Sequence, residues 1–141
     1  MPLTQMEHFL VLTDDIDATR DFYCNVLGLR PGPRPPLQFT GYWVYLGDVP
    51  CIHIADWRSY QAHARQTGIA ISTRAPGTGP VDHIAFNATD YDAVKARLQA
   101  HGVLPAENLV PNVGLRQLFF CDPNGVKIEL NIPGPPPGRA R

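Results

Sequence analysis

Residues 81–87 read VDHIAFN, a short stretch in which apolar and polar side chains alternate around one imidazole, that of His83. Such alternation is typical of a β-strand with one buried face. A single histidine on a buried face is most often a core residue whose ring is hydrogen-bonded. The interpretation of His83 therefore depends on whether related residues occur elsewhere in the chain.

A second copy of this pattern lies 75 residues earlier, where residues 6–12 read MEHFLVL. Glu7 and His8 repeat the acid–histidine pair formed by Asp82 and His83. The segments that follow also correspond at the same offset: Asp15, Asp17, Ala18 and Arg20 match Asp90, Asp92, Ala93 and Lys95. The chain is therefore interpreted as two copies of one structural unit.

The ends of the two copies correspond as well. Residues 51–56 read CIHIAD and residues 126–132 read VKIELNI, which puts His53 and Glu129 at matching positions, 76 residues apart. Each copy thus has one metal-competent residue on its first strand and one on its last. A carboxylate midway along an apolar strand costs several kcal/mol to bury without a partner. Core packing alone does not account for this repeated pattern of residues that are able to bind a metal ion.

The order of elements in each copy is expected to be a strand, a helix and three further strands. In the first copy we expect a strand at 5–12, a helix at 16–27 stopped by Gly28, a short irregular strand within 31–36, hairpin strands at 42–46 and 51–55, and a weakly capped helical segment at 57–68. Residues 71–80 are expected to be a linker. In the second copy we expect a strand at 81–87, a helix at 91–101 stopped by Gly102, a strand at 104–109, and hairpin strands at 115–121 and 126–131 around the turn 122–125.

The predicted fold class is α+β, with two tandem βαβββ modules that form cupped mixed sheets around a metal site. Residues 1–132 are expected to be a single domain, with module one at 4–70 and module two at 80–132. Residues 133–141 are rich in proline and are expected to be a flexible tail, because proline cannot donate to a sheet or continue a helix.

The amino-acid composition limits the partners and the cellular compartment that we expect for the protein. The 141 residues carry 12 basic and 13 acidic side chains, a formal net charge of −1, and no basic stripe, which argues against nucleic acid or an anionic membrane as a partner. No apolar run approaches the length of a membrane span. Three cysteines without CxxC spacing indicate free thiols and a cytoplasmic location.

Three stretches of the chain resemble the vicinal oxygen chelate superfamily, which includes glyoxalases, fosfomycin-resistance proteins, extradiol dioxygenases and methylmalonyl-CoA epimerases. They are EHFLVLTDDIDATRDFYCNVLGL at 7–29, VDHIAF at 81–86 and FFCDPNGVKIEL at 119–130. The resemblance covers nearly the whole chain. It implies the two-module fold and a divalent metal ion, with iron, manganese, nickel, zinc and cobalt as the candidates.

By this resemblance, His8, His83 and Glu129 are the metal ligands on the first, fifth and eighth strands. Two imidazoles and one carboxylate suit a divalent first-row ion and leave positions for substrate oxygens. His53 stands at the fourth ligand position, where glyoxalase-like members carry a carboxylate and epimerase-like members an amide. A histidine departs from both, and three roles are open to it: a metal ligand, a residue of the pocket wall, or a base beside the metal.

Further residues are weaker candidates for contact with a substrate: Lys127, Arg116, Trp43 and Cys51. Strand alternation puts Lys127 on the face of Glu129, where it could pair with a substrate anion. Arg116 could clamp a carboxylate or phosphate, although surface exposure is the favoured interpretation. Trp43 is expected in the core or lining an apolar pocket, and Cys51 is expected to act as a small apolar residue. The two other histidines, His63 and His101, are expected on the surface.

Four functions agree with the resemblance, and the fourth, a transferase similar to the fosfomycin-resistance proteins, ranks lowest because nothing in the sequence marks a thiol cosubstrate or a potassium site. The first is a metal-dependent, glyoxalase-like lyase or isomerase that binds two neighbouring oxygens of a small substrate to the metal, while Glu129 or His53 transfers a proton. The four-residue constellation and the small size of the chain favour it. The second is an extradiol-type dioxygenase with Fe(II) on His8, His83 and Glu129. The third is a binding protein that sequesters a ligand, against which the complete ligand set argues. A homodimer and a small-molecule substrate are also implied.

Overall fold

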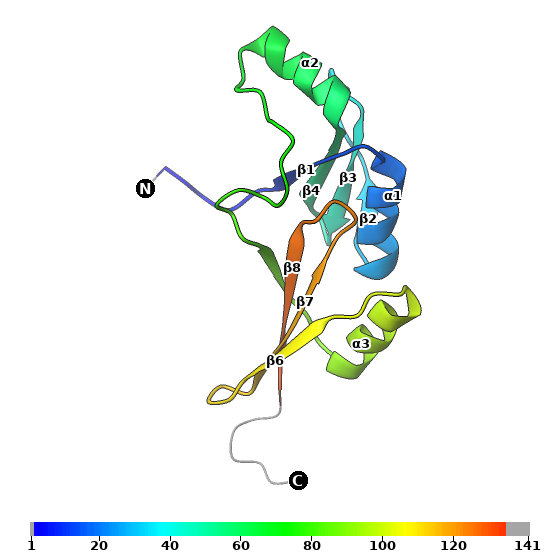
Figure 1. Ribbon diagram of the computed structural model, residues 1–141, viewed down its shortest axis with the longest axis vertical. Coiled ribbons are helices and arrows are strands. Elements are labelled where there is room, and N and C mark those ends of the chain that lie inside the picture. Colours follow the sequence, from blue (N-terminus) through cyan, green and yellow to red (C-terminus); the bar gives the residue numbers. More distant parts are fainter. Residues whose placement is uncertain (1, 135–141) are drawn as a thin grey trace. The chain divides into compact units, whose positions relative to one another are not determined.

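The computed structural model describes residues 2–134. The chain forms two compact units that divide between Arg74 and Ala75, inside the segment predicted to be a linker. Each unit contains one four-stranded mixed sheet, ordered β1-β4-β3-β2 in the first unit and β5-β8-β7-β6 in the second (Figure 1). The identical strand order confirms the predicted α+β fold of two tandem βαβββ-like modules.

The first unit consists of four strands, two α-helices and one π-helical turn. The elements are β1 (Phe9–Thr13), α1 (Ile16–Asp21), the π-helical turn η1 (Phe22–Val26), β2 (Arg30–Gly32), β3 (Gly41–Leu46), β4 (Val49–Asp56) and α2 (Trp57–Thr67). β1 pairs in parallel with β4, and the remaining pairs are antiparallel. The core of this unit contains Val44, Ile52 and Ile54 from the sheet and Tyr23 from η1, all almost fully buried.

The helix predicted at 16–27 is therefore two pieces. It begins as expected, with the Asp15 side chain accepting a hydrogen bond from the Ala18 amide at 2.9 Å. From Phe22 the chain widens into a π-helical turn, in which the Leu27 amide donates to the Phe22 carbonyl five residues back. The helical segment stops at Gly28, whose φ of 81° confirms the predicted left-handed end.

The prediction of weak caps for the second helix was wrong. The Asp56 carboxylate accepts a hydrogen bond from the Ser59 amide at 2.8 Å, which satisfies one of the unpaired amides at the start of α2. Gly68 ends the helix with a φ of 76°. An aspartate that is also the last residue of a strand was not recognised as a cap.

The second unit repeats the plan without a second connecting helix. Its elements are β5 (Ile84–Asn87), α3 (Tyr91–Ala100), β6 (Ala106–Val110), β7 (Leu115–Cys121) and β8 (Lys127–Pro133). β5 pairs in parallel with β8. The β7–β8 turn follows the prediction, because the Asp122 carboxylate accepts from the amides of Asn124 and Val126, and Gly125 has a φ of 85°.

Several boundaries differ from those predicted, and three of them affect the candidate site or the tail. β1 and β5 begin at Phe9 and Ile84, so the two histidines directly precede their strands instead of lying within them. β8 continues to Pro133, and the Gly134 amide donates to the Gly114 carbonyl at 2.5 Å, so the predicted tail does not begin at 133. The rest of that tail, residues 135–141, lies outside the described residues.

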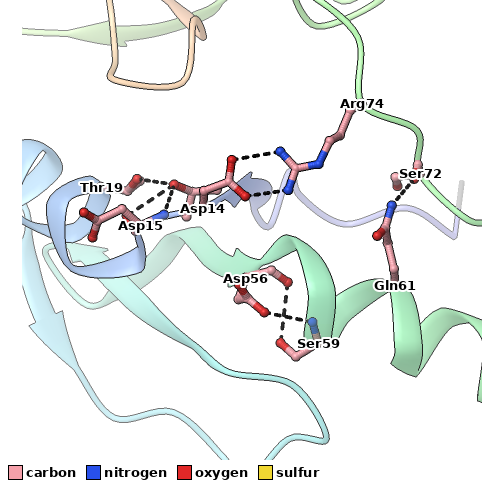
Figure 2. Close-up of polar contacts among 9 residues, drawn as sticks. Asp14, Asp15, Thr19, Asp56, Ser59, Gln61, Ser72 and Arg74 are labelled. Carbon is pink, nitrogen blue, oxygen red and sulfur yellow. Dashed lines mark hydrogen bonds and ion pairs between the residues drawn. The ribbon is translucent and has the colours of Figure 1, made fainter.

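The segment after α2 is attached to the first unit by polar contacts (Figure 2). The Arg74 guanidinium donates two hydrogen bonds to the Asp14 carboxylate and lies over the Trp57 ring at 4.9 Å. The Gln61 side chain donates to the Ser72 carbonyl at 3.0 Å. These contacts hold the chain on the first unit as far as the boundary between the units. Among the described helices, none combines the length and the apolarity that crossing a membrane would require.

Substituting Gly41 tests the packing of the first sheet. Gly41 lies opposite Ala55, and a Cβ atom there would overlap the backbone carbonyl of Ile54. Because a carbonyl in a strand ladder cannot move aside independently, we expect Gly41→Ala to lower the free energy of unfolding by about 1–3 kcal/mol. Urea unfolding monitored by circular dichroism measures it. Gly32→Ala is the matched control, because its Cβ would meet only the Tyr45 ring, and it should cost less. Equal costs would contradict the backbone explanation.

Candidate metal centre

His8 and His83 directly precede β1 and β5, and each is hydrogen-bonded to the acidic residue before it. His8 Nδ1 lies 2.8 Å from Glu7 Oε1, and His83 Nδ1 lies 2.8 Å from Asp82 Oδ2. An ionised carboxylate only accepts hydrogen bonds, so each Nδ1 is the donor of its pair, and a neutral ring in this orientation presents the lone pair of Nε2. Carboxylates fix metal-binding histidines in this way in many metal sites. In both units, the acidic residue therefore orients the histidine ring in a way that suits metal binding.

In the second unit, His83 and Glu129 form a pair suited to a cation. His83 Nε2 lies 3.0 Å from Glu129 Oε1, and the carboxylate side chain is only 12% exposed. Two lone-pair atoms at this distance need a proton or a positive ion between them. With metal–ligand distances of about 2.1 Å, two ligands at a right angle are about 3.0 Å apart. The spacing of these two atoms therefore fits a shared divalent ion.

The matching pair in the first unit has a different geometry. The His8 and His53 rings are stacked, with centroids 3.6 Å apart and planes inclined by 11°, and Trp43 stacks on the other side of His53 at 4.1 Å. The Nε2 atom of His53 is buried and has no hydrogen-bond partner among residues 2–134. An imidazole binds a metal in its own plane, so two parallel rings do not direct their lone pairs at one ion. As arranged, one of the two rings would have to rotate for both to be ligands.

The environment of His53 keeps the imidazole neutral. Burial, followed by the charge of His8, lowers the pKa of His53 from 6.5 to about 4, and the charge of Arg34 contributes in the same direction. A neutral ring stacks well between His8 and Trp43. It also has a free lone pair for a metal or a proton.

The four candidates for substrate contact lie in different surroundings. Lys127 Nζ lies 3.0 Å from Asp82 Oδ2, and hydrogen bonds from His83 and then Lys127 lower the pKa of Asp82. Trp43 belongs to the ring stack described above. Burial raises the pKa of the Cys51 thiol, which agrees with its expected role as a small apolar residue and not a thiolate.

The structure does not bring Arg116 to the face of Glu129. Along β7 the side chains of Leu118 and Phe120 are buried, and Arg116 shares their face by alternation. Its guanidinium lies 4.1 Å from the centre of the Tyr91 ring of α3, and its Nε atom is buried. Arg116 is therefore neither the exposed residue that was expected nor a neighbour of the metal-type pair.

The expectation for one remaining histidine was also wrong. His63 is half-buried, with its ring 4.9 Å from that of Phe39, because α2 lies against the loop that precedes β3. His101 is exposed, as expected.

Two residues beside Glu129 were not identified from the sequence as parts of the site. Gln117 Nε2 and Asn131 Nδ2 both donate to Glu129 Oε2, at 3.2 and 2.6 Å. Alternation along β8 places Asn131 beside Glu129, but Gln117 reaches it only through the register of the β7–β8 hairpin. Within residues 2–134, no three histidine, cysteine or acidic side chains lie close enough together to hold an ion.

The chain belongs to the Glyoxalase/Bleomycin resistance protein/Dioxygenase superfamily, whose sequence pattern it matches over residues 5–130. It is 33% identical over 132 residues to Glyoxylase I 4 of Arabidopsis thaliana, covering 91% of this chain and 70% of that protein. It is 25% identical over 130 residues to Biphenyl-2,3-diol 1,2-dioxygenase 2 of Rhodococcus globerulus, covering 89% of this chain and 60% of that enzyme.

Solved structures share the fold. A variant of the fosfomycin resistance protein FosX from Listeria monocytogenes, in complex with Mn(II) and 1S,2S-dihydroxypropylphosphonic acid, matches with a TM-score of 0.69 and 16% identity. The match covers 93% of this chain and 93% of that one. At this identity the likeness concerns the fold alone.

The depressed pKa of His53 predicts a loss of stability in acid. An unfolded histidine titrates near 6.5, so between pH 6.5 and about 4 the unfolded state binds more protons than the folded state. The free energy of unfolding of metal-free protein should therefore fall as the pH is lowered from 7 to 4. Urea unfolding at several pH values measures this, and His53→Gln should weaken the dependence. His101→Gln, at an exposed position, is the control. An unchanged dependence in His53→Gln would contradict the assignment.

Proposed function

We propose that the protein is a metal-dependent lyase or isomerase of the glyoxalase type that acts on a small oxygenated substrate. The single observation that carries the proposal is the 3.0 Å approach of His83 Nε2 to the largely buried Glu129 carboxylate, with Asp82 holding the other ring nitrogen. The identity to Glyoxylase I 4 of Arabidopsis thaliana supports this reaction class.

The proposed ligands are His8, His83 and Glu129, with His53 as the fourth candidate. Glu7 and Asp82 fix the tautomers of the two acid-paired histidines, so that both present Nε2. Once bound, a divalent ion such as iron, manganese, nickel, zinc or cobalt would polarise two neighbouring oxygens of the substrate as a Lewis acid. His53 and Trp43, which stack on each other within the first unit, are proposed as residues of an apolar pocket wall.

Proton transfer next to the substrate carbonyl is assigned to His53 or Glu129. A neutral imidazole with an unpaired Nε2 can accept a proton, and so can a carboxylate oxygen. Lys127 is available to an anionic group of the substrate only in competition with Asp82, to which it is already bonded.

A second function is favoured by one observation. The parallel stacking of His8 and His53 leaves a three-residue set of His8, His83 and Glu129, a composition that suits Fe(II) in oxygen-dependent enzymes. The resemblance to Biphenyl-2,3-diol 1,2-dioxygenase 2 agrees with ring cleavage by such a set. The third candidate, a protein that sequesters a ligand without metal, predicts no metal uptake. The proposed assembly is a homodimer, which light scattering on the purified chain tests.

Metal content tests the proposal directly. Protein purified without chelator, or reconstituted with Zn(II), Ni(II), Co(II), Mn(II) or Fe(II) under anaerobic conditions, should hold about one ion per chain. His83→Ala and Glu129→Ala should each lower the metal affinity at least about 10-fold, because each removes a direct ligand. Elemental analysis after dialysis measures the content, and His101→Ala is the matched control at an exposed histidine.

The response of His53→Ala separates the two enzyme candidates. Loss of metal in this variant as well would support four ligands, and hemithioacetals and acyl thioesters are then the substrates to assay. Retention of metal would support three ligands and direct the assays to catechols with Fe(II). Wild-type protein that takes up no ion would overturn both and leave the sequestering protein.

A further inference from the structure

A row of side-chain amides crosses three strands of the second sheet and ends on Glu129. Asn108 on β6, Gln117 on β7 and Asn131 on β8 are direct cross-strand neighbours. Asn108 Nδ2 donates to Gln117 Oε1 at 2.8 Å, and Gln117 Nε2 donates to Asn131 Oδ1 at 3.0 Å. We call these three residues the amide ladder. Its last two members both donate to Glu129 Oε2.

The charge of Glu129 determines the direction of every bond in the ladder. An ionised carboxylate is only an acceptor, so Gln117 and Asn131 must turn their NH2 groups toward it. Gln117 then presents its carbonyl oxygen to the edge strand, where Asn108 donates to it. Both protons of the Gln117 amide are used, one on Glu129 and one on Asn131. The ladder therefore has one arrangement that satisfies all its members.

The ladder leaves the two oxygens of Glu129 unequal. Oε2 accepts two hydrogen bonds, whereas Oε1 faces His83 Nε2 at 3.0 Å. With the side chain 12% exposed, little water competes for either oxygen. A carboxylate held in this way offers a single oxygen in a fixed direction.

The first unit has no equivalent of the ladder. His53 occupies the place of Glu129, and the register puts Gly41 and Ala55 where the second unit has Gln117 and Asn131. Neither residue has a polar side chain, and His53 Nε2 is left without a partner. The ladder is thus specific to the carboxylate and is not a general feature of the repeated unit.

We propose that Asn108, Gln117 and Asn131 are positioning residues that hold Glu129 as a fixed ligand through Oε1, instead of leaving it mobile as a proton carrier. This inference rests on the proposed metal-binding function. It assigns proton transfer to a group other than Glu129. Asn108 is included because it alone orients the Gln117 amide from the edge of the sheet.

The ladder itself is tested in metal-free protein. In 15N-labelled samples, the side-chain amide protons of Gln117 and Asn131 should exchange with solvent more slowly than that of Gln99, which lies at an exposed position of α3. Glu129→Ala should abolish the difference, because it removes the shared acceptor. Rapid exchange in the wild type, or no response to Glu129→Ala, would overturn the inference whatever the metal results are.

The effect of the amide ladder on metal binding is tested by the Zn(II) affinity, which is measured by competition with a chromophoric chelator. Gln117→Leu and Asn131→Leu should weaken binding about 10–100-fold, the range found for residues that orient a ligand. Asn108→Ala should have a smaller effect, and Gln99→Leu should have none. The metal-free variants are compared by thermal unfolding, to establish that they are folded.

A double-mutant cycle separates positioning from general stability. In a Glu129→Gln background, Gln117→Leu should cause no further loss of Zn(II) affinity, because the group that it positions has already been changed. Additive losses would show that Gln117 acts on the fold and would overturn the inference. Wild-type protein that takes up none of Zn(II), Ni(II), Co(II), Mn(II) and Fe(II) would defeat the proposed function, and the exchange experiment would then decide on the ladder alone.

Discussion

Parallel hydrogen bonding between the first and last strand of each unit is the constraint on which the site depends. β1 pairs with β4 and β5 with β8, in a register that sets Leu10 beside His53 and Ala85 beside Glu129. Each histidine before a first strand is thereby brought to a residue more than 40 positions later in the chain. A slip of one residue would turn His53 or Glu129 to the opposite face of its sheet. The buried residues that alternate with them, Ile52 and Ile128, oppose such a slip.

The sequence predicted this framework because the signals for it are local and repeated. The acid–histidine pairs, the apolar alternation and the glycine after the first helix each determine structure within a few residues. The strand order then follows from placing the matched residues of each copy together. The π-helical turn of Phe22–Val26 was not predicted, since a widened turn shows the same apolar spacing as an α-helix over so short a segment.

The details of the site could not be predicted, because they depend on side-chain contacts that the periodicity of the sequence does not specify. The stacking of His8, His53 and Trp43 requires the side-chain conformations of three residues on two strands and a preceding loop. Gln117 reaches Glu129 only through the hairpin register, and the burial of Arg116 against Tyr91 depends on where α3 lies. The position of a residue along its strand was therefore predictable, whereas the residues that it contacts on neighbouring strands were not. The roles of the four proposed ligands remain predictions until metal binding is measured.

The two units share a backbone plan but differ in the chemistry that it presents. One has a neutral, ring-stacked imidazole, and the other has a carboxylate hydrogen-bonded by amides. Gly41 restricts how substitutions could remove this difference between the units. Because any side chain at that position would collide with the Ile54 carbonyl, an amide of the kind that Gln117 supplies could enter the first unit only with a shift of the β3–β4 backbone. The two units therefore differ at the backbone as well as in their side chains, since the close approach of two strands in the first leaves no room for the amide that the second uses.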